Sequence, residues 1–379
     1  MKTWLITSAT MLAFVAAIIV GCSSGSDGSS TPSGLPSCSS ATLLTVAPLA
    51  NADIHELAPL GNLAPSGHTF PSDHMYFYTA FTGGGTASAP IASPGAIRVS
   101  SVLLQKRTGG GAAEFDDYGL SFFSCSTLEF YFGHITTLSA GLAAQVGSLD
   151  QSCDTPYQTG GSTFQQCSKN VDIALSAGDA IGTAGGPGQG ALDLGAIDHA
   201  STALAFVDPG RITGQGGVHA ACPIDYFVPG VRDALLQLVA VNGVHRTVAP
   251  ICGTIMQDVA NTAQGRWFFD ATVQEDHHLA LVHTSWDPTI GAFSIGTSLP
   301  GTPSTLLFFT PAVSGRLNLD FNRVTADGNI YCYQFTNSSS RIYIRLETVT
   351  RLRIEFAASG ACGDPAGWSF SAAAVTFDR

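Results

Sequence analysis

Two histidines and a carboxylate lie close together between Gly67 and Tyr78, in the segment GHTFPSDHMYFY. They are His68, Asp73 and His74, and imidazole and carboxylate groups are ligands that zinc accepts. Residues from 74 onward predict a strand, in which successive side chains point to opposite faces. His74 then shares a face with Tyr76 and Tyr78, opposite Asp73. Only one of Asp73 and His74 is therefore expected to point where His68 points, and a hydrogen-bonded structural loop is the alternative interpretation.

A weaker candidate for a metal site follows in the C-terminal third, where Glu275-Asp276-His277-His278 precedes His283. On one strand, residues five apart point to opposite faces, so His278 and His283 would not share a metal ion. We expect a structural role for this segment. Ser294 lacks the Gly-x-Ser-x-Gly turn of a hydrolase nucleophile, so no catalytic serine is indicated.

Six aromatic residues of the same region offer a different chemistry, because sugars stack on flat rings. They either line a carbohydrate-binding face or fill a β core. The six are Trp267, Trp286, Tyr331, Tyr333, Tyr343 and Trp368.

The N-terminus predicts export. Lys2 is followed by an apolar run, Met11 to Val20, which is too short to cross a membrane as a helix. The tetrad Ile19-Val20-Gly21-Cys22 resembles the lipobox of bacterial lipoproteins. The resemblance implies cleavage of a signal peptide (1–21) before Cys22, diacylation of its thiol, and attachment of the mature chain to a membrane by that lipid. A tether rich in Ser, Gly and Pro (22–44) is expected to follow.

Composition favours strands and tight turns over amphipathic helices, because glycine is 42 of 379 residues and only 12% are charged. The formal net charge of −12 argues against a nucleic-acid partner, which would need a basic face. About 340 residues remain after the signal and tether, which favours two domains. The fold class we expect is mainly β.

Eight cysteines remain besides Cys22, and an even number in an exported chain favours disulfides. No two cysteines have the CxxC spacing that would indicate a zinc ribbon. Sequence does not fix the pairing, but short loops favour Cys153–Cys167, Cys222–Cys252 and Cys332–Cys362, which leaves Cys38–Cys125.

Hydrophobic patterning divides the chain further. Residues 45–205 predict short strands separated by Gly and Pro, 206–265 a linking segment with one helix at Val231–Val241, and 266–379 a C-terminal β-sandwich or small barrel. Predicted strands are His74–Phe81, Ala96–Leu104, Tyr118–Cys125, Leu128–Phe132, Ala191–Ile197, Trp267–Val273, His278–His283, Phe293–Gly296, Gly315–Phe321, Ile330–Phe335, Arg341–Glu347, Arg351–Phe356 and Trp368–Phe377. A turn, a short strand and a glycine turn are expected between Ile173 and Gly186.

The order of several segments resembles the lysostaphin-type zinc endopeptidases of peptidoglycan. These segments are His68 in its loop, Ala92-Ser-Pro-Gly-Ala-Ile97, Tyr131-Phe-Gly-His-Ile135, Ala177-Gly-Asp-Ala-Ile-Gly182 and Ala191-Leu-Asp-Leu-Gly195. They span about residues 61 to 197, and only the histidine positions are specific. The resemblance implies a lysostaphin-like β domain with a zinc site, in which His68 is the first ligand and His134 a catalytic histidine.

The chain departs from that family at two places. Asp73 stands five rather than four residues after His68, and the family's final His-x-His is Ala191-Leu192-Asp193. By position, Asp73 or His74 becomes the second metal ligand and Asp193 the third. Loss of the imidazole at Ala191 removes a group of the kind that is worth about 10²- to 10⁴-fold in rate.

These features predict a cell-envelope lipoprotein, held to a membrane by its N-terminal lipid and exposed to the periplasm or cell exterior. Its domain of peptidase-like fold is expected to act as a binding or scaffold module on peptidoglycan. The alternatives are a zinc-dependent peptidoglycan endopeptidase with a modified site and a glycan-binding adhesin. The enzyme hypothesis requires that the chain bring His68 close to Asp193.

Overall fold

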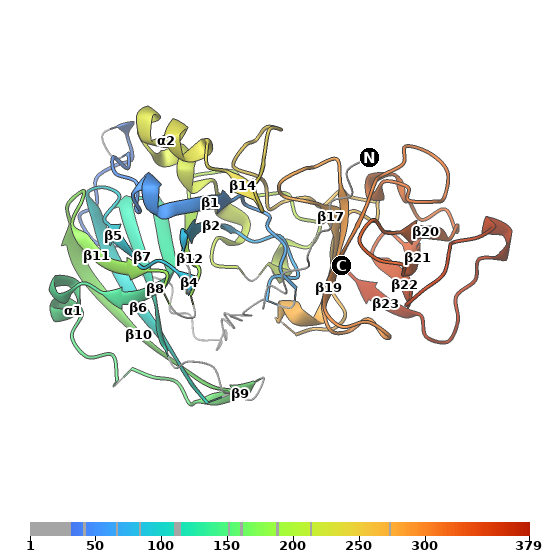
Figure 1. The fold of residues 1–379 in the computed structure, drawn as a ribbon, viewed down its shortest axis with the longest axis horizontal. Coiled ribbons are helices and arrows are strands. Elements are labelled where there is room, and N and C mark those ends of the chain that lie inside the picture. The colour runs from blue at the N-terminus through green and yellow to red at the C-terminus, as the bar shows by residue number, and fades with distance from the viewer. Residues whose placement is uncertain are drawn as a thin grey trace.

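A computed structural model describes residues 32–40, 43–65, 67–82, 85–109, 115–150, 152–159, 162–186, 189–212, 214–272 and 274–379. The predicted signal peptide and Cys22 lie outside these residues. None of the helices in the described ranges is both long and apolar enough to span a bilayer. The protein is mainly β, as predicted, and its strands gather in two regions (Figure 1).

The N-terminal region is built on one large antiparallel sheet. Its strands run in the order β1 (Ile54–Ala58), β2 (His74–Thr79), β12 (Ala191–Asp198), β8 (Leu128–Leu138), β7 (Phe115–Cys125), β6 (Ile97–Gly109), β10 (Ser162–Leu175) and β9 (Tyr157–Thr159). Beside this path, β11 (Ala180–Ala184) pairs with β5 (Ala89–Ala92) and β8, and β13 (Ala220–Ala221) pairs with β12. A small hairpin joins β3 (Phe81–Thr82) to β4 (Gly85–Thr86).

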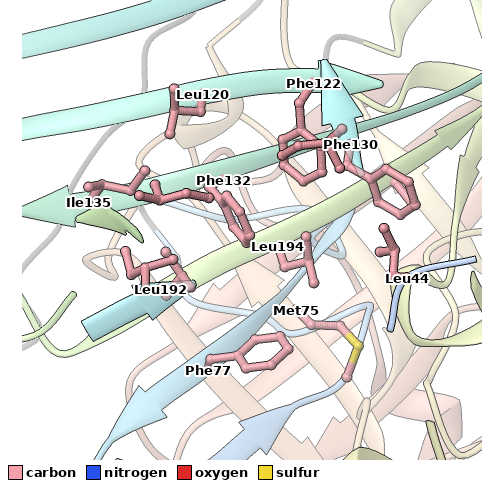
Figure 2. Close-up of a cluster of buried hydrophobic side chains, with 14 of the residues drawn as sticks. Leu44, Met75, Phe77, Leu120, Phe122, Phe130, Phe132, Ile135, Leu192 and Leu194 are labelled. Atoms are coloured by element: carbon pink, nitrogen blue, oxygen red, sulfur yellow. The ribbon is translucent and has the colours of Figure 1, made fainter. Parts of the chain in front are cut away.

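Alternation along three neighbouring strands separates an apolar face from a polar one. Met75 and Phe77 of β2, Leu192 and Leu194 of β12, and Phe130 and Phe132 of β8 are all buried in the first core (Figure 2). Their neighbours in sequence, including His74 and Asp193, point to the other side because strand side chains alternate. The same three strands thus supply a hydrophobic core and, behind it, a polar surface.

The linking segment packs against the first core. Ile224, Phe227, Leu235 and Val239 are buried in it. The predicted helix is α2 (Pro229–Leu236), which ends earlier than expected because the chain turns into a hairpin of β14 (Ala240–Val241) and β15 (Val244–His245). The backbone of Val239 forms a bridge with Leu57, so tertiary pairing overrides the helical spacing here.

The C-terminal region contains two four-stranded antiparallel sheets around one buried cluster, which fits the predicted sandwich. The first sheet is β16 (Gly265–Trp267), β17 (Leu279–His283), β18 (Gly291–Ile295) and β19 (Thr305–Phe309). The second is β20 (Tyr331–Gln334), β21 (Arg341–Thr348), β22 (Arg351–Ala357) and β23 (Val375–Asp378).

Several predicted elements were wrong or incomplete. The predicted strand Gly315–Phe321 is irregular chain with isolated bridges at Leu317 and Leu319, and the prediction for Trp368–Phe377 holds only at its end, in β23. The expected strand Trp267–Val273 ends outside the described residues, at Val273, and of its described residues only Trp267 lies in a strand. The sequence prediction missed several strands, among them β1, β19 and the largely polar β10. It also missed α1 (Ala140–Val146), although Ser139 caps that helix by accepting from Leu142 N.

All four expected disulfides are present: Cys38–Cys125, Cys153–Cys167, Cys222–Cys252 and Cys332–Cys362. Four disulfides are typical of a chain that folds in an oxidising compartment. They therefore agree with the predicted export, while the lipid anchor itself stays a prediction.

Candidate functional site: a buried cluster of histidines and carboxylates

The polar face of β2, β12 and β8 brings together three of the side chains that sequence had singled out. Asp193 on the middle strand lies opposite Tyr76 of β2 and Gly133 of β8 in the registers. His74 Nε2 is 3.5 Å from Asp193 Oδ2, and His134 Nε2 is 3.3 Å from the same oxygen. All three side chains are buried, with exposed fractions of 6%, 11% and 2% for His74, His134 and Asp193. Two imidazoles therefore face one carboxylate oxygen away from solvent.

Each of the two imidazoles is held from behind by a second carboxylate. Asp73 Oδ1 lies 3.0 Å from His74 Nδ1, and Asp117 Oδ2 lies 2.9 Å from His134 Nδ1. Asp117 also accepts a hydrogen bond from Gln189 Nε2 at 2.9 Å. A carboxylate at Nδ1 holds the proton there and leaves Nε2 to face a ligand, which is the arrangement that orients histidines in metal sites.

Asp73 lies behind His74 rather than beside His68. Besides His74, its carboxylate accepts hydrogen bonds from Tyr131 Oη at 2.7 Å and from Gly216 N at 2.8 Å. Burial alone would raise the pKa of Asp73, but the hydrogen bonds from His74, Tyr131 and Gly216 outweigh it and hold that pKa below its ordinary value. Asp73 is thus a charged group that orients His74.

Gly195 makes the contact between Tyr131 and Asp73 possible. Gly195 of β12 is paired with Tyr131 of β8, and a Cβ at Gly195 would overlap the Tyr131 ring. The glycine lets the ring lie flat across β12, so that its hydroxyl reaches Asp73. This gives a physical reason for a glycine two residues after Asp193 in a buried strand.

His134 has an unusual backbone. Its φ is +63°, in the left-handed region that non-glycine residues rarely adopt. It lies where β8 stops pairing with β12, at Gly133, and begins pairing with β11, at Ile135. The register between β7 and β8 also shifts here. Such bulges redirect a side chain and are frequent beside active sites, and this one turns His134 toward Asp193.

His68 joins the cluster from its loop. Its backbone N–H and C=O both bond to Ala64, at 2.8 Å each. Its ring centroid lies 5.1 Å from that of His74 and 6.0 Å from that of Tyr76. Burial and the nearby His74 lower the pKa of His68 to about 3, so its imidazole is neutral near pH 7. The structure therefore connects His68 to Asp193 through His74.

Opposite charges surround the other two histidines. Burial opposes protonation of both rings, but Asp193 and Asp117 raise the pKa of His134 to about 10, and Asp193 and Asp73 raise that of His74. Without a bound cation, the cluster is thus a chain of alternating carboxylates and imidazoles. A cation between the Nε2 atoms and Asp193 would take the place of the proton.

The nitrogen and oxygen atoms of this cluster are ligand types that zinc accepts. Zinc bonds of about 2.0–2.1 Å separate neighbouring ligand atoms in a tetrahedron by roughly 3.3 Å, close to the two separations measured here. In the part of the chain that the structure describes, His74 Nε2 and Asp193 Oδ1 are buried without a hydrogen-bond partner. As the side chains stand, however, no three His, Cys, Asp or Glu groups of the described ranges form a site ready to hold a metal ion. The donor atoms are of the types that zinc binds, but the side chains would have to move closer together when zinc binds.

The C-terminal domain reaches this site through the segment that follows His68. Glu275 Oε2 accepts from Phe70 N at 3.2 Å, and Arg266 donates to Pro71 O at 3.3 Å. The Phe70 ring packs against Phe268 with centroids 5.2 Å apart. We name this group of five residues the interdomain clamp.

Sequence reasoning placed His68, His74, His134 and Asp193 in one site, and the structure brings them together. It missed Asp117, Gln189 and Tyr131, which orient the inner residues. Asp117 gave no local signal because its neighbours are typical of any strand, and only the pairing of β7 with β8 brings it to His134. Tyr131 lay inside a quoted segment, but nothing in its spacing showed a bond to Asp73.

The second histidine cluster has the expected structural bonds. His277 Nδ1 lies 3.2 Å from Asp270, His283 Nε2 lies 3.2 Å from Asp320, and His278 accepts from Phe269 N. Three of the six aromatics proposed for a glycan surface, Trp267, Tyr331 and Tyr333, are buried in the second core and cannot line such a face. Only Trp286, Tyr343 and Trp368 remain for it.

Comparisons with protein-family models, with curated proteins and with solved structures give no match to this chain.

Proposed function

We propose that the chain is an exported zinc-dependent hydrolase whose metal centre is formed by His74, His134 and Asp193, with His68 at its edge. One observation carries this proposal: two buried histidines direct Nε2 at a single carboxylate oxygen while separate carboxylates fix their Nδ1 atoms. Structural ion pairs do not need both features. Outer carboxylates of this kind tune metal ligands.

Each residue has a distinct part in this proposal. His74, His134 and Asp193 would hold the metal ion, while Asp73 and Asp117 keep the imidazoles in the correct tautomer. A bound zinc supplies Lewis acidity, which polarises a carbonyl and activates water for hydrolysis. His68 is neutral and less buried than His74 and Asp193, so its ring could serve as a fourth ligand or hydrogen-bond to a substrate.

The proposed substrate is a peptide bond of peptidoglycan. The resemblance of residues 61–197 to lysostaphin-type endopeptidases supports this choice, as do the predicted lipobox and the disulfides, which agree with an envelope location. A lipid at Cys22 would keep the domain close to the cell wall. The predicted tether is wrong at its C-terminal end, because the disulfide Cys38–Cys125 and the buried Leu44 fix that part of the chain to the N-terminal region.

A second candidate is a peptidoglycan-binding scaffold in which the cluster only stabilises the fold. The observation that favours it is the arrangement of the side chains: within the described ranges they form no ready three-ligand site, and Asp193 and Asp117 already favour the charged form of the His134 imidazole. In this case the histidines would be structural.

Metal analysis separates the two candidates. Protein purified without chelator is assayed for zinc by mass spectrometry, beside His74→Ala and the control His199→Ala, whose imidazole instead pairs with Glu129. The enzyme predicts about one zinc per chain in the wild type and control and little in His74→Ala. Metal-free wild-type protein that does not take up added zinc, yet sediments with insoluble peptidoglycan, would favour the scaffold.

A further inference from the structure

A separate cavity lies between the end of the linking segment and the C-terminal sheet. Its volume is about 270 Å³, and its lining includes Arg246, Asp258, Gln264 and Ser285. None of these residues belongs to the histidine cluster. Pockets for drug-sized ligands are about 300–1,000 Å³, so this cavity suits a smaller molecule.

Arg246 brings a buried positive charge to the cavity. Arg246 is only 6% exposed. Its side chain donates from Nε to Pro250 O at 2.7 Å and from Nη1 to Ser285 O. Among the described residues no carboxylate lies within ion-pair distance of its guanidinium, and Asp287 acts on it only at longer range. A guanidinium has five N–H donors and stays charged, so donors remain for an anionic ligand.

Two oxygen atoms of other lining residues also lack partners. Gln264 Oε1 and Ser285 Oγ are buried and make no hydrogen bond within the described part of the chain, and the residues are 7% and 3% exposed. A buried polar atom left unpaired costs about 1–3 kcal/mol, which a bound polar molecule can recover. Both residues lie in the same cavity as Arg246.

Asp258 adds a fixed negative charge. Its two carboxylate oxygens accept from the backbone N–H groups of Arg266 at 3.1 Å and Val207 at 3.0 Å. These bonds hold the carboxylate in place. The guanidinium groups of Arg266 and Arg379 also act on its charge, although neither forms an ion pair with it within the described residues. The cavity therefore presents one cation, one anion and unpaired oxygen atoms within a small volume.

We propose that this cavity binds a free α-amino acid. The carboxylate of such a ligand pairs with Arg246 and the Ser285 hydroxyl, and its ammonium group donates to Gln264 Oε1 beside the charge of Asp258. A ligand with only a carboxylate would leave Asp258 facing Arg266 and Arg379 alone, and a ligand with only an ammonium group would leave Arg246 without a carboxylate. The proposal does not depend on the hydrolase, because the two sites share no residue.

Isothermal titration calorimetry on the full chain tests the proposal. The probes are glycine, L-alanine, D-alanine, L-glutamate and D-glutamate, and the single-charge controls are propionate and ethylamine. At least one amino acid is expected to bind at least tenfold more tightly than either control. No binding by any of the five at 10 mM, or no amino acid binding tenfold more tightly than both propionate and ethylamine, would overturn the proposal.

A matched pair of variants locates the binding. Ser285→Ala and Ser294→Ala each remove a buried serine hydroxyl without a partner, but Ser294 lies in the core of β18 and does not line the cavity. Both variants should fold, since each loses an unpaired polar atom. Ser285→Ala is expected to weaken amino-acid binding by at least fivefold and Ser294→Ala to leave it unchanged. Equal affinity in both variants would contradict the assignment to this cavity.

Discussion

Replacing Asp73 by asparagine tests whether the cluster is built for a metal ion. The carboxylate accepts three hydrogen bonds, from His74 Nδ1 at 3.0 Å, Tyr131 Oη at 2.7 Å and Gly216 N at 2.8 Å. The asparagine oxygen can keep the first two, but its NH₂ group then faces the Gly216 N–H, donor against donor. Asp73→Asn therefore loses one charge-assisted bond and weakens two others.

The expected magnitude follows from these bonds. A hydrogen bond to a charged group contributes about 1.5–3 kcal/mol and a neutral one about 1, so Asp73→Asn should destabilise the fold by about 3 kcal/mol. Because the charge of the outer carboxylate also raises the basicity of the His74 ring, zinc affinity should fall about 10- to 100-fold. Urea unfolding measures the first quantity and competition with a fluorescent chelator the second.

The control is Asp172→Asn, which breaks an exposed ion pair with Arg98. Exposed pairs contribute little, so stability should change by less than about 1 kcal/mol and zinc affinity should not change. Folded Asp73→Asn protein with wild-type zinc affinity would refute the role assigned to Asp73.

Three further predictions concern His134, Phe70 and the disulfide Cys222–Cys252. In protein freed of metal by a chelator, the free energy of unfolding should fall as the pH rises from 6.5 through about 10. The reason is that Asp193 and Asp117 outweigh the effect of burial and raise the pKa of His134 to about 10 in the folded protein. His134→Gln should flatten this pH dependence in urea unfolding. Phe70→Ala should cost about 3–5 kcal/mol and weaken zinc binding, since it removes the ring of the interdomain clamp two residues after His68. Calorimetry measures the stability and chelator competition the zinc affinity, and unchanged zinc affinity would show that the clamp does not act on the site. Replacing Cys222 and Cys252 by serine opens a loop with a sequence separation of 30 and should lower stability by about 3–4 kcal/mol in urea unfolding, and no loss would show that the packing of the linking segment suffices.

The parts of the fold that sequence predicted are those set by local pattern. Alternation gave β2, with His74 on the polar face and Met75 in the core, and short cysteine loops gave the disulfides. Of the missed strands, β10 is largely polar, so its hydrogen bonds to β6 rather than its own side chains define it. Tertiary pairing also shortened the predicted helix after Leu236.

The site could be predicted only in its inner residues. Histidines and acidic residues are rare enough in this chain to be noticed, so His68, His74, His134 and Asp193 were found by type and order. The bulge at His134 and the hydrogen bond from Tyr131 to Asp73 arise from strand pairing at long sequence separation. Asp117, 17 residues from His134 in sequence, becomes its partner only when β7 and β8 pair.

Anomalous X-ray diffraction at the zinc absorption edge, on crystals of protein purified without chelator and soaked in zinc, tests the central claim most directly. The proposed function predicts one strong peak about 2 Å from His74 Nε2, His134 Nε2 and a carboxylate oxygen of Asp193. A map with no peak there, while the imidazoles stay hydrogen-bonded to Asp193, would show that the cluster is an ion-pair network and not a metal centre.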